Sequence, residues 1–210
     1  FFQKRKVHSK NSTVFYPAMP INTPICAAAW DWVQALLPEK RADHSFRVAE
    51  LAYELAIFHE LGHPEDAYLA GLLHDNAKYD TPDTLSAKGI PSDLCRQSLY
   101  NRYPKIWHAF VGPRQALSIT TNTRVLSAMR WHTTGRARMQ PLAQVLFVAD
   151  FCEPNRMGEW PATVRKAAYE NLDKATAIIA QLLVHAHGEN CFWATQACFN
   201  DYRKRPNIGL

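Results

Sequence analysis

The segment LAGLLHDNAK, residues 69–78, ends a run of small and apolar residues on the adjacent pair His74 and Asp75. The apolar run is typical of a buried helix, whereas ionisable side chains are seldom buried unless they are paired or bind a metal. The pair therefore predicts that other parts of the chain supply it with partners in the interior of the protein.

The flanking sequence predicts helices almost throughout. Apolar residues recur at helical spacing between Val48 and Phe58, and Pro64 suits the first turn of the helix that leads to His74. No stretch alternates in the manner of a strand. We therefore expect an all-α bundle of seven or more helices, at 25–37, 40–61, 64–78, 91–101, 104–119, 122–132, 141–152, 161–187 and 190–203.

Residues 1–24 differ from the rest of the chain. They contain three prolines and have no helical period, so we expect a tail or linker at 1–24 before a domain at 25–205. The chain begins with Phe1 rather than Met, which leaves room for an upstream domain.

The composition is that of an ordinary globular protein, with 47% hydrophobic and 20% charged residues among 210. No apolar run reaches the roughly 18 residues of a membrane-spanning helix, so no membrane is expected as a partner. The five cysteines form no Cys-x-x-Cys pair, which favours a reducing, cytoplasmic location. The net charge of +5 fits an anionic partner, but without a basic stripe interleaved with aromatic residues nucleic acid is not favoured.

Histidines and an aspartate on four other expected helices could meet the pair at 74–75. Their nitrogen and oxygen atoms suit one or two divalent cations such as iron, manganese or zinc. Each residue alone has an ordinary structural explanation, but a metal centre would satisfy all of them together. The predicted ligands are His44, His74, Asp75, His108, His132 and Asp150.

An aspartate between two groups of histidines can bridge two metal ions through its two oxygens. A water molecule held between such ions has its pKa lowered to about 7, which makes it a hydroxide nucleophile near neutral pH. The ligand set is therefore typical of a hydrolytic centre.

The order of these residues resembles the HD-domain superfamily of metal-dependent phosphohydrolases: RADHSFRVAELA at 41–52, LAGLLHDNAK at 69–78, and then Asp150. Four further stretches resemble the YqeK-like family, bacterial HD enzymes that hydrolyse diadenosine tetraphosphate symmetrically to two ADP. These stretches are WHAFVG at 107–112, RWHTTGRARM at 130–139, VLFVADFCEPNR at 145–156 and VRKAAYENLDKA at 164–175. The resemblance implies an HD-domain helical bundle with a di-iron centre on the same six ligands, in which Asp75 is the bridge.

A nucleotide polyphosphate also needs basic side chains beside the metal ions to neutralise its phosphates. Lys78 follows the pair at 74–75, and Arg47 projects from nearly the same helix face as His44. The loop after His132 offers hydroxyls, backbone N–H groups and the fork of Arg136. The predicted phosphate ligands are Arg47, Lys78, Thr133, Thr134, Gly135, Arg136 and Arg156, and Lys78 joins Asp75 as a predicted catalytic residue.

Two alternatives stay open. Another HD phosphohydrolase could act on nucleoside phosphates or guanosine tetraphosphate, although the HTTGR and EPNR segments favour the tetraphosphatase. A non-catalytic nucleotide-sensing module could keep the fold, but such modules typically lose metal ligands, and all six are present here. We therefore expect a dinucleoside polyphosphate as the partner, and a homodimer is left open.

Overall fold

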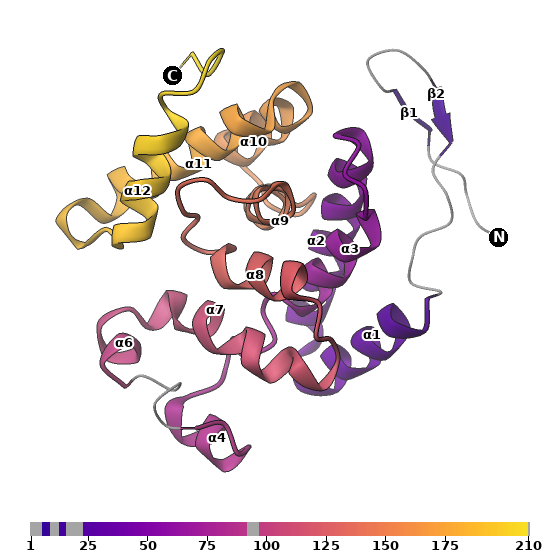
Figure 1. Cartoon of the computed structure of the whole chain (residues 1–210), viewed down its shortest axis with the longest axis vertical. Helices are drawn as coiled ribbons and strands as arrows, with labels where there is room; N and C mark the ends of the chain where they lie inside the picture. The colour runs from indigo at the N-terminus through magenta and orange to yellow at the C-terminus, as the bar shows by residue number, and fades with distance from the viewer. Residues whose placement is uncertain (1–5, 9–12, 16–22, 92–96, 210) are drawn as a thin grey trace.

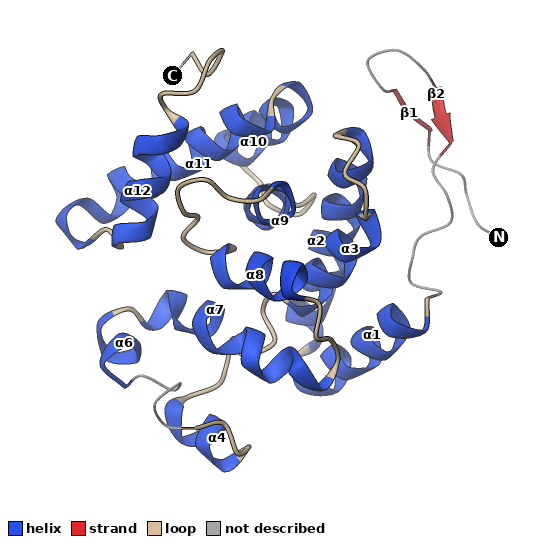
Figure 2. Cartoon of the chain, viewed as in Figure 1, coloured by secondary structure: helices blue, strands red, loops and turns tan. Residues whose placement is uncertain are grey.

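The computed structural model describes residues 6–8, 13–15, 23–91 and 97–209, and it confirms the all-α bundle (Figure 1). Helices make up nearly all of the domain (Figure 2). They are α1 (Pro24–Leu36), α2 (Glu39–Phe58), α3 (Pro64–Leu73), α4 (Pro82–Ala87), α6 (Gln97–Arg102), α7 (Pro104–Gln115), α8 (Thr123–Trp131), α9 (Pro141–Cys152), α10 (Glu159–Glu170), α11 (Leu172–His187) and α12 (Trp193–Tyr202), with short 3₁₀ turns η2 (Ala116–Ser118) and η3 (Gly188–Asn190). Within the described residues, no helix combines the length and apolarity needed to cross a membrane.

The core forms around α9, whose residues from Leu142 to Ala149 are all buried. This helix packs against α2, α3, α8, α10 and α11, and Figure 1 shows it end-on in the middle of the bundle. Because its sequence has no continuous polar face, this helix is buried on all sides, and its one polar residue between Leu142 and Ala149, Gln144, donates to Asp173 of α11 (2.8 Å). Asp150 belongs to the last turn of α9, so the core fixes its position.

A glycine sets how closely α2 and α3 pack. A Cβ atom on Gly71 would lie 2.4 Å from the Cα atom of Ala49, so only glycine allows this approach of the two backbones. Gly71 precedes His74 by three residues. The close contact therefore determines how the end of α3 presents His74 and Asp75.

A second, smaller apolar cluster supports α7. Leu85 from α4 packs there with Ile90, Trp107 and Val111. The six-residue helix α4 is not among the expected helices, and it begins at a capping box formed by Thr81 and Thr84.

Of the helix expected at 91–101, residues 92–96 lie outside the described residues, and α6 covers Gln97–Arg102. Two other expected helices differ most from the structure. The helix expected at 64–78 ends at Leu73, and residues 74–79 continue as turns whose bonds join residues three apart, such as the Lys78 N–H to the Asp75 carbonyl (2.9 Å). The helix expected at 161–187 is divided into α10 and α11. Asn171 adopts an extended conformation there, and its side chain accepts a hydrogen bond from the Lys174 N–H (3.1 Å), which caps α11.

The segment 1–24, expected to be a tail or linker before the helical domain, contains a short pair of strands, and its residues 1–5, 9–12 and 16–22 lie outside the described part of the chain. Two three-residue strands, β1 (Lys6–His8) and β2 (Thr13–Phe15), pair antiparallel with Val7 opposite Val14. Strands this short carry too few alternating residues to be recognised from a sequence pattern.

Candidate metal centre

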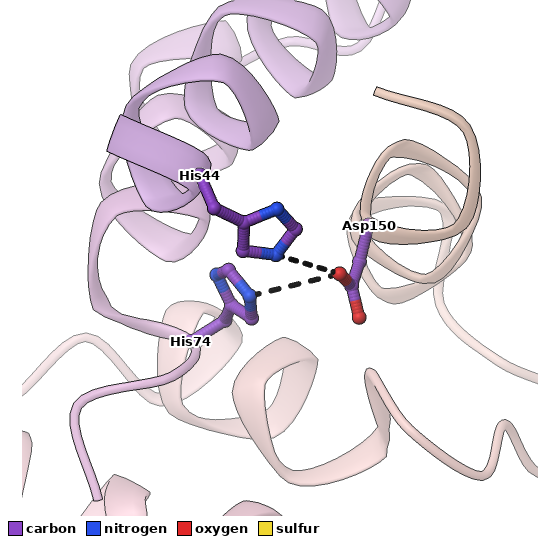
Figure 3. A group of neighbouring side chains, drawn as sticks. All are labelled: His44, His74 and Asp150. Carbon is purple, nitrogen blue, oxygen red and sulfur yellow. Dashed lines mark hydrogen bonds and ion pairs between the residues drawn. The ribbon is translucent and has the colours of Figure 1, made fainter. Parts of the chain in front are cut away.

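The six predicted ligands converge from five segments of the chain. His44 comes from α2, His74 and Asp75 from the turn after α3, His108 from α7, His132 from the end of α8, and Asp150 from α9. Figure 3 shows His44, His74 and Asp150 pointing toward one another.

Asp150 is the centre of the first group of ligands. Its Oδ1 atom lies 3.1 Å from His44 Nε2 and 3.8 Å from His74 Nε2. One ligand atom from each of these three residues lies within 4.8 Å of the other two, a spacing suited to a shared cation.

Asp75 is the centre of the second group. Its Oδ1 atom lies 2.9 Å from His108 Nε2 and 3.5 Å from His132 Nε2, and its Oδ2 atom lies 3.5 Å from His74 Nε2. Because His74 belongs to both groups, the two groups are adjacent. The two oxygens of Asp75 face different histidines, as a bridging carboxylate requires.

In three histidines a hydrogen-bond acceptor behind the ring fixes the tautomer of the neutral form. His74 Nδ1–H donates to the Gly71 carbonyl (2.7 Å), and His132 Nδ1–H donates to the Met129 carbonyl (2.7 Å). His44 Nδ1–H donates to a carboxylate oxygen of Glu153 (3.2 Å). Since the proton is on Nδ1 in each neutral ring, the Nε2 lone pair is free to bind a metal.

The donors fit a divalent cation. His74 is completely buried, yet its Nε2 atom has no hydrogen-bond partner among the described residues. A buried polar atom without a partner is costly, and lone pairs directed at carboxylate oxygens repel them. A cation between the lone pairs and the carboxylates removes both penalties.

The ionised carboxylates of the site favour the binding of a cation. Burial would raise the pKa of Asp75, but the neighbouring histidines His74, His108 and His132 hold it well below its ordinary value. Burial lowers the pKa of His108 to about 4 and also lowers that of His132. The pKa of His74 is raised, since Asp75 and Asp150 outweigh its burial, and the pKa of Asp150 is lowered, since His44 and His74 outweigh its burial. Both carboxylates are therefore ionised and favour positive charge at the Nε2 atom of His74, which a bound metal ion would supply in place of a proton.

Three basic side chains surround the two carboxylates. Lys78 Nζ lies 3.2 Å from both Asp75 Oδ1 and His108 Nε2, and an Arg156 nitrogen lies 3.3 Å from Asp150 Oδ1. Both are predicted phosphate ligands. The third is Arg41, which the sequence does not predict as a site residue and which donates to Asp75 Oδ2 (3.0 Å). The signal for Arg41 was its position one helical turn before His44.

Other predicted phosphate ligands have different contacts. Arg47 donates to Glu153 (2.9 Å), while the exposed Arg136 donates to the Ala137 carbonyl (3.2 Å). Thr134 is buried and donates to the Gly135 carbonyl (2.9 Å). Gly135 has a φ of +60°, and a Cβ atom on it would lie 2.7 Å from the Cys198 sulfur. The turn and the close approach of Cys198 therefore account for a glycine at position 135. Its role in phosphate binding stays a prediction.

Glu153 is a residue of the site that the sequence analysis did not name. It is 2% exposed and accepts hydrogen bonds from His44 Nδ1, Arg47 Nε and the Asn155 backbone N–H (3.2, 2.9 and 2.7 Å). A buried carboxylate behind a candidate ligand fixes the orientation of that ligand. Its position in the EPNR segment, one helical turn after Asp150, is the feature of the sequence that could have indicated this role.

The chain is similar to several known proteins. The HD domain family model matches residues 41–155. The symmetrical bis(5'-nucleosyl)-tetraphosphatase of Staphylococcus aureus is 32% identical over 154 residues, covering 70% of this chain and 77% of that protein. The enzyme of the same name from Bacillus subtilis is 34% identical over 146 residues, covering 68% and 77%. A crystal structure of a predicted HD superfamily hydrolase involved in NAD metabolism from Clostridium acetobutylicum is 28% identical, covers 84% of this chain and 96% of that one, and gives a TM-score of 0.73.

Proposed function

The chain belongs to the HD domain family and groups within it with the symmetrical bis(5'-nucleosyl)-tetraphosphatases, and we propose that it hydrolyses diadenosine tetraphosphate to two molecules of ADP. The observation that carries the proposal is the convergence of two ionised carboxylates with four histidine Nε2 atoms, bordered by three basic side chains. This set of residues can hold divalent metal and phosphate together.

HD domains use divalent metal ions, and the donor set suits two of them. His44, His74 and Asp150 would hold one ion; Asp75, His108 and His132 would hold the other, with Asp75 able to reach both. We propose iron, with manganese or zinc as the other ions that these nitrogen and oxygen donors accept. When bound, such ions supply Lewis acidity, which lowers the pKa of a coordinated water and neutralises phosphate oxygens.

The protein's own cations have two roles in this proposal. Arg41, Lys78 and Arg156 each contact one of the carboxylates, so they neutralise the buried negative charge in part. Their remaining N–H groups are available to phosphoryl oxygens, and Lys78 Nζ is the one placed beside both Asp75 and His108. Arg136 and the loop 133–135 would contact phosphates farther from the cleaved bond.

The organisation of the chain forms part of the same proposal. We assign the phosphohydrolase domain to residues 25–205 and treat 1–24 as a segment outside it. The cytoplasmic location rests on cysteine usage alone, and the four cysteines among the described residues are free thiols.

Product identification tests the proposed function. The purified protein, loaded with iron, manganese or zinc, is incubated with diadenosine tetraphosphate, and the products are separated by chromatography. We expect ADP as the sole product, loss of activity with a chelator, and recovery when metal is restored.

Other products would contradict the proposal. ATP together with AMP would show asymmetric cleavage. Phosphate release only from nucleoside phosphates or guanosine tetraphosphate would favour another HD phosphohydrolase. Binding without turnover by the metal-loaded protein would favour a sensing module.

A further inference from the structure

A cavity of about 530 Å³ lies between α1, the end of α4 and the end of α7. Its volume is within the range of small-molecule sites. Figure 1 shows α4 and the end of α7 at the lower edge of the bundle, whereas α10 and α11 lie at the upper edge. The side chains that line the cavity belong neither to the six predicted metal ligands nor to the predicted phosphate ligands. They therefore have no part in the proposed function.

Four of the residues that line the cavity are apolar. Trp32 and Leu36 lie one turn apart on the same face of α1, and they are joined by Ile90 and by Leu117 of η2. Leu117 is 37% exposed, and Trp32 and Leu36 are half-buried, so part of this apolar surface is in contact with solvent. Covering it with a flat apolar ring system would be favourable.

The charged side chains of the cavity are basic. They are Lys88 and Arg114, and no acidic side chain lines the cavity in the part of the chain that the structure describes. Lys88 Nζ donates to Asp80 Oδ1 (2.7 Å), so its charge is offset by a carboxylate beneath it. Arg114 is exposed, and its guanidinium makes no hydrogen bond or ion pair with the described residues. Its fork is therefore available to an acidic head group, which it can bind through two parallel hydrogen bonds.

The polar lining of the cavity is connected to the turn that carries Asp75. Gln115 Nε2 donates to the Asn76 carbonyl (3.1 Å), and Asn76 follows Asp75 directly in the chain. Lys88 Nζ contacts Asp80 farther along the same turn and also donates to Gln115 Oε1 (3.3 Å). Two side chains of the cavity therefore hold both ends of this turn and contact each other. A ligand that attracts either of them changes the restraints on the turn.

We propose that this cavity is a regulatory site for a small organic anion with an aromatic body, and that its occupancy changes the affinity of the metal centre. The acidic head group pairs with Arg114, and the ring packs against Trp32 and Leu117. The effect reaches the turn after α3 through Gln115 and Lys88. An effector acts when it interacts differently with two states of such an element. The proposal goes beyond the proposed function, because it concerns a ligand other than the dinucleotide.

Calorimetric titration of the purified protein with naphthoate and, separately, with naphthylphosphonate tests the site. The two anions share a flat apolar body and differ in the head group, so they distinguish a carboxylate from a phosphate ligand. Arg114→Gln removes the charge, and we expect it to weaken binding of the anion that the wild type prefers about tenfold. Leu117→Ser removes apolar surface and should weaken binding about fivefold.

Each variant has a matched control. Arg203→Gln removes an exposed arginine that follows α12, and Ile25→Ser removes an exposed apolar side chain of α1 that does not line the cavity. Both should bind the anions as the wild type does. The site is ruled out if the wild type binds neither anion at millimolar concentration, or if Arg114→Gln and Leu117→Ser bind with wild-type affinity.

Manganese titration with and without the saturating anion tests the regulation. We expect the Kd for manganese to change about fivefold or more in the wild type and in Arg203→Gln. It should stay constant in Arg114→Gln at the same anion concentration, because the cavity is then largely empty. An unchanged Kd in the wild type would rule out regulation, and an equal change in Arg114→Gln would show that the anion acts at the metal centre itself. These titrations contain no dinucleotide, so their failure leaves the proposed function standing, and a protein that does not cleave diadenosine tetraphosphate can still show the regulatory site.

Discussion

The His44 side chain shows how one ligand is held for its task. Its Nε2 atom faces Asp150 and its Nδ1 atom donates to Glu153, which is itself held by Arg47 and the Asn155 N–H. Glu153 contacts no phosphate in this account, so it acts by positioning His44.

Replacing Glu153 should therefore change metal affinity. Loss of a partner behind a metal-binding histidine typically costs 10- to 100-fold in affinity, and we expect a loss of about this size for Glu153→Ala. Glu153→Gln keeps an oxygen that can accept from His44, so it should restore part of the affinity. Metal titration followed by thermal shift measures this, with Glu189→Ala, an exposed position, as the control. Equal metal affinity in Glu153→Ala and the wild type would show that the hydrogen bond has no positioning role.

Asp75 is the residue whose loss should be most severe. Its carboxylate contacts three histidines, Arg41 and Lys78. We expect Asp75→Ala to lose activity and bound metal together, because the bridging ligand is gone, while the circular dichroism spectrum stays helical. Turnover at the wild-type rate with metal still bound would rule out the bridging role.

Lys78 and Arg136 should affect different substrates. Lys78 contacts Asp75 and His108, so Lys78→Ala should slow both diadenosine tetraphosphate and a nitrophenyl phosphate ester. Arg136 is exposed and lies away from these contacts, so Arg136→Ala should reduce kcat/KM only for the dinucleotide. A charge-assisted hydrogen bond of about 1.5–3 kcal/mol corresponds to a loss of roughly 10- to 150-fold. Equal losses on both substrates for Arg136→Ala would show that the loop shapes the metal site instead.

At the scale of elements, the contact between α2 and α3 determines where the paired residues at the end of α3 lie. Gly71→Ala places a Cβ atom 2.4 Å from Ala49 Cα, so the two helices must separate. We expect a destabilisation of about 1–3 kcal/mol, a fall in Tm of roughly 2–12 °C, and weaker metal binding, because His74 is displaced.

Gly62→Ala is the matched control for this prediction. A Cβ atom on Gly62 meets nothing within 4 Å, and its backbone is outside the left-handed region. Its Tm and metal affinity should equal those of the wild type. A Gly71→Ala variant with the same Tm as Gly62→Ala would contradict the role given to the contact.

Element boundaries show where sequence reasoning succeeds and where it stops. The sequence predicts α2 and α9 within three residues at each end, because the burial of α2 follows the helical repeat and α9 is a nearly continuous apolar run that begins at Pro141. Periodicity joined α10 to α11, since apolar residues continue on both sides of Asn171 and only the backbone turn there separates them. It extended α3 to residue 78, whereas Asn76 donates to the Gly112 carbonyl of α7 (3.0 Å), a contact that no local pattern contains.

At the scale of the whole molecule, the sequence predicts which residues form the candidate site. It does not predict the hydrogen bonds that join them to other parts of the chain. Six ionisable residues at apolar helix positions needed a common partner, and five segments of the chain bring them together. Arg41 and Glu153 were missed because their roles depend on contacts with Asp75 and His44 that span 34 and 109 residues. The cavity was missed for the same reason, since its walls come from α1, the end of α4, α7 and η2.

The central claim is that the six residues hold two metal ions. Anomalous X-ray scattering from crystals grown with manganese tests it most directly. The account predicts two anomalous peaks, one at His44, His74 and Asp150 and one at Asp75, His108 and His132, with ligand distances of about 2.0–2.3 Å. A single peak, or peaks that leave Asp150 or His132 uncoordinated, would contradict it.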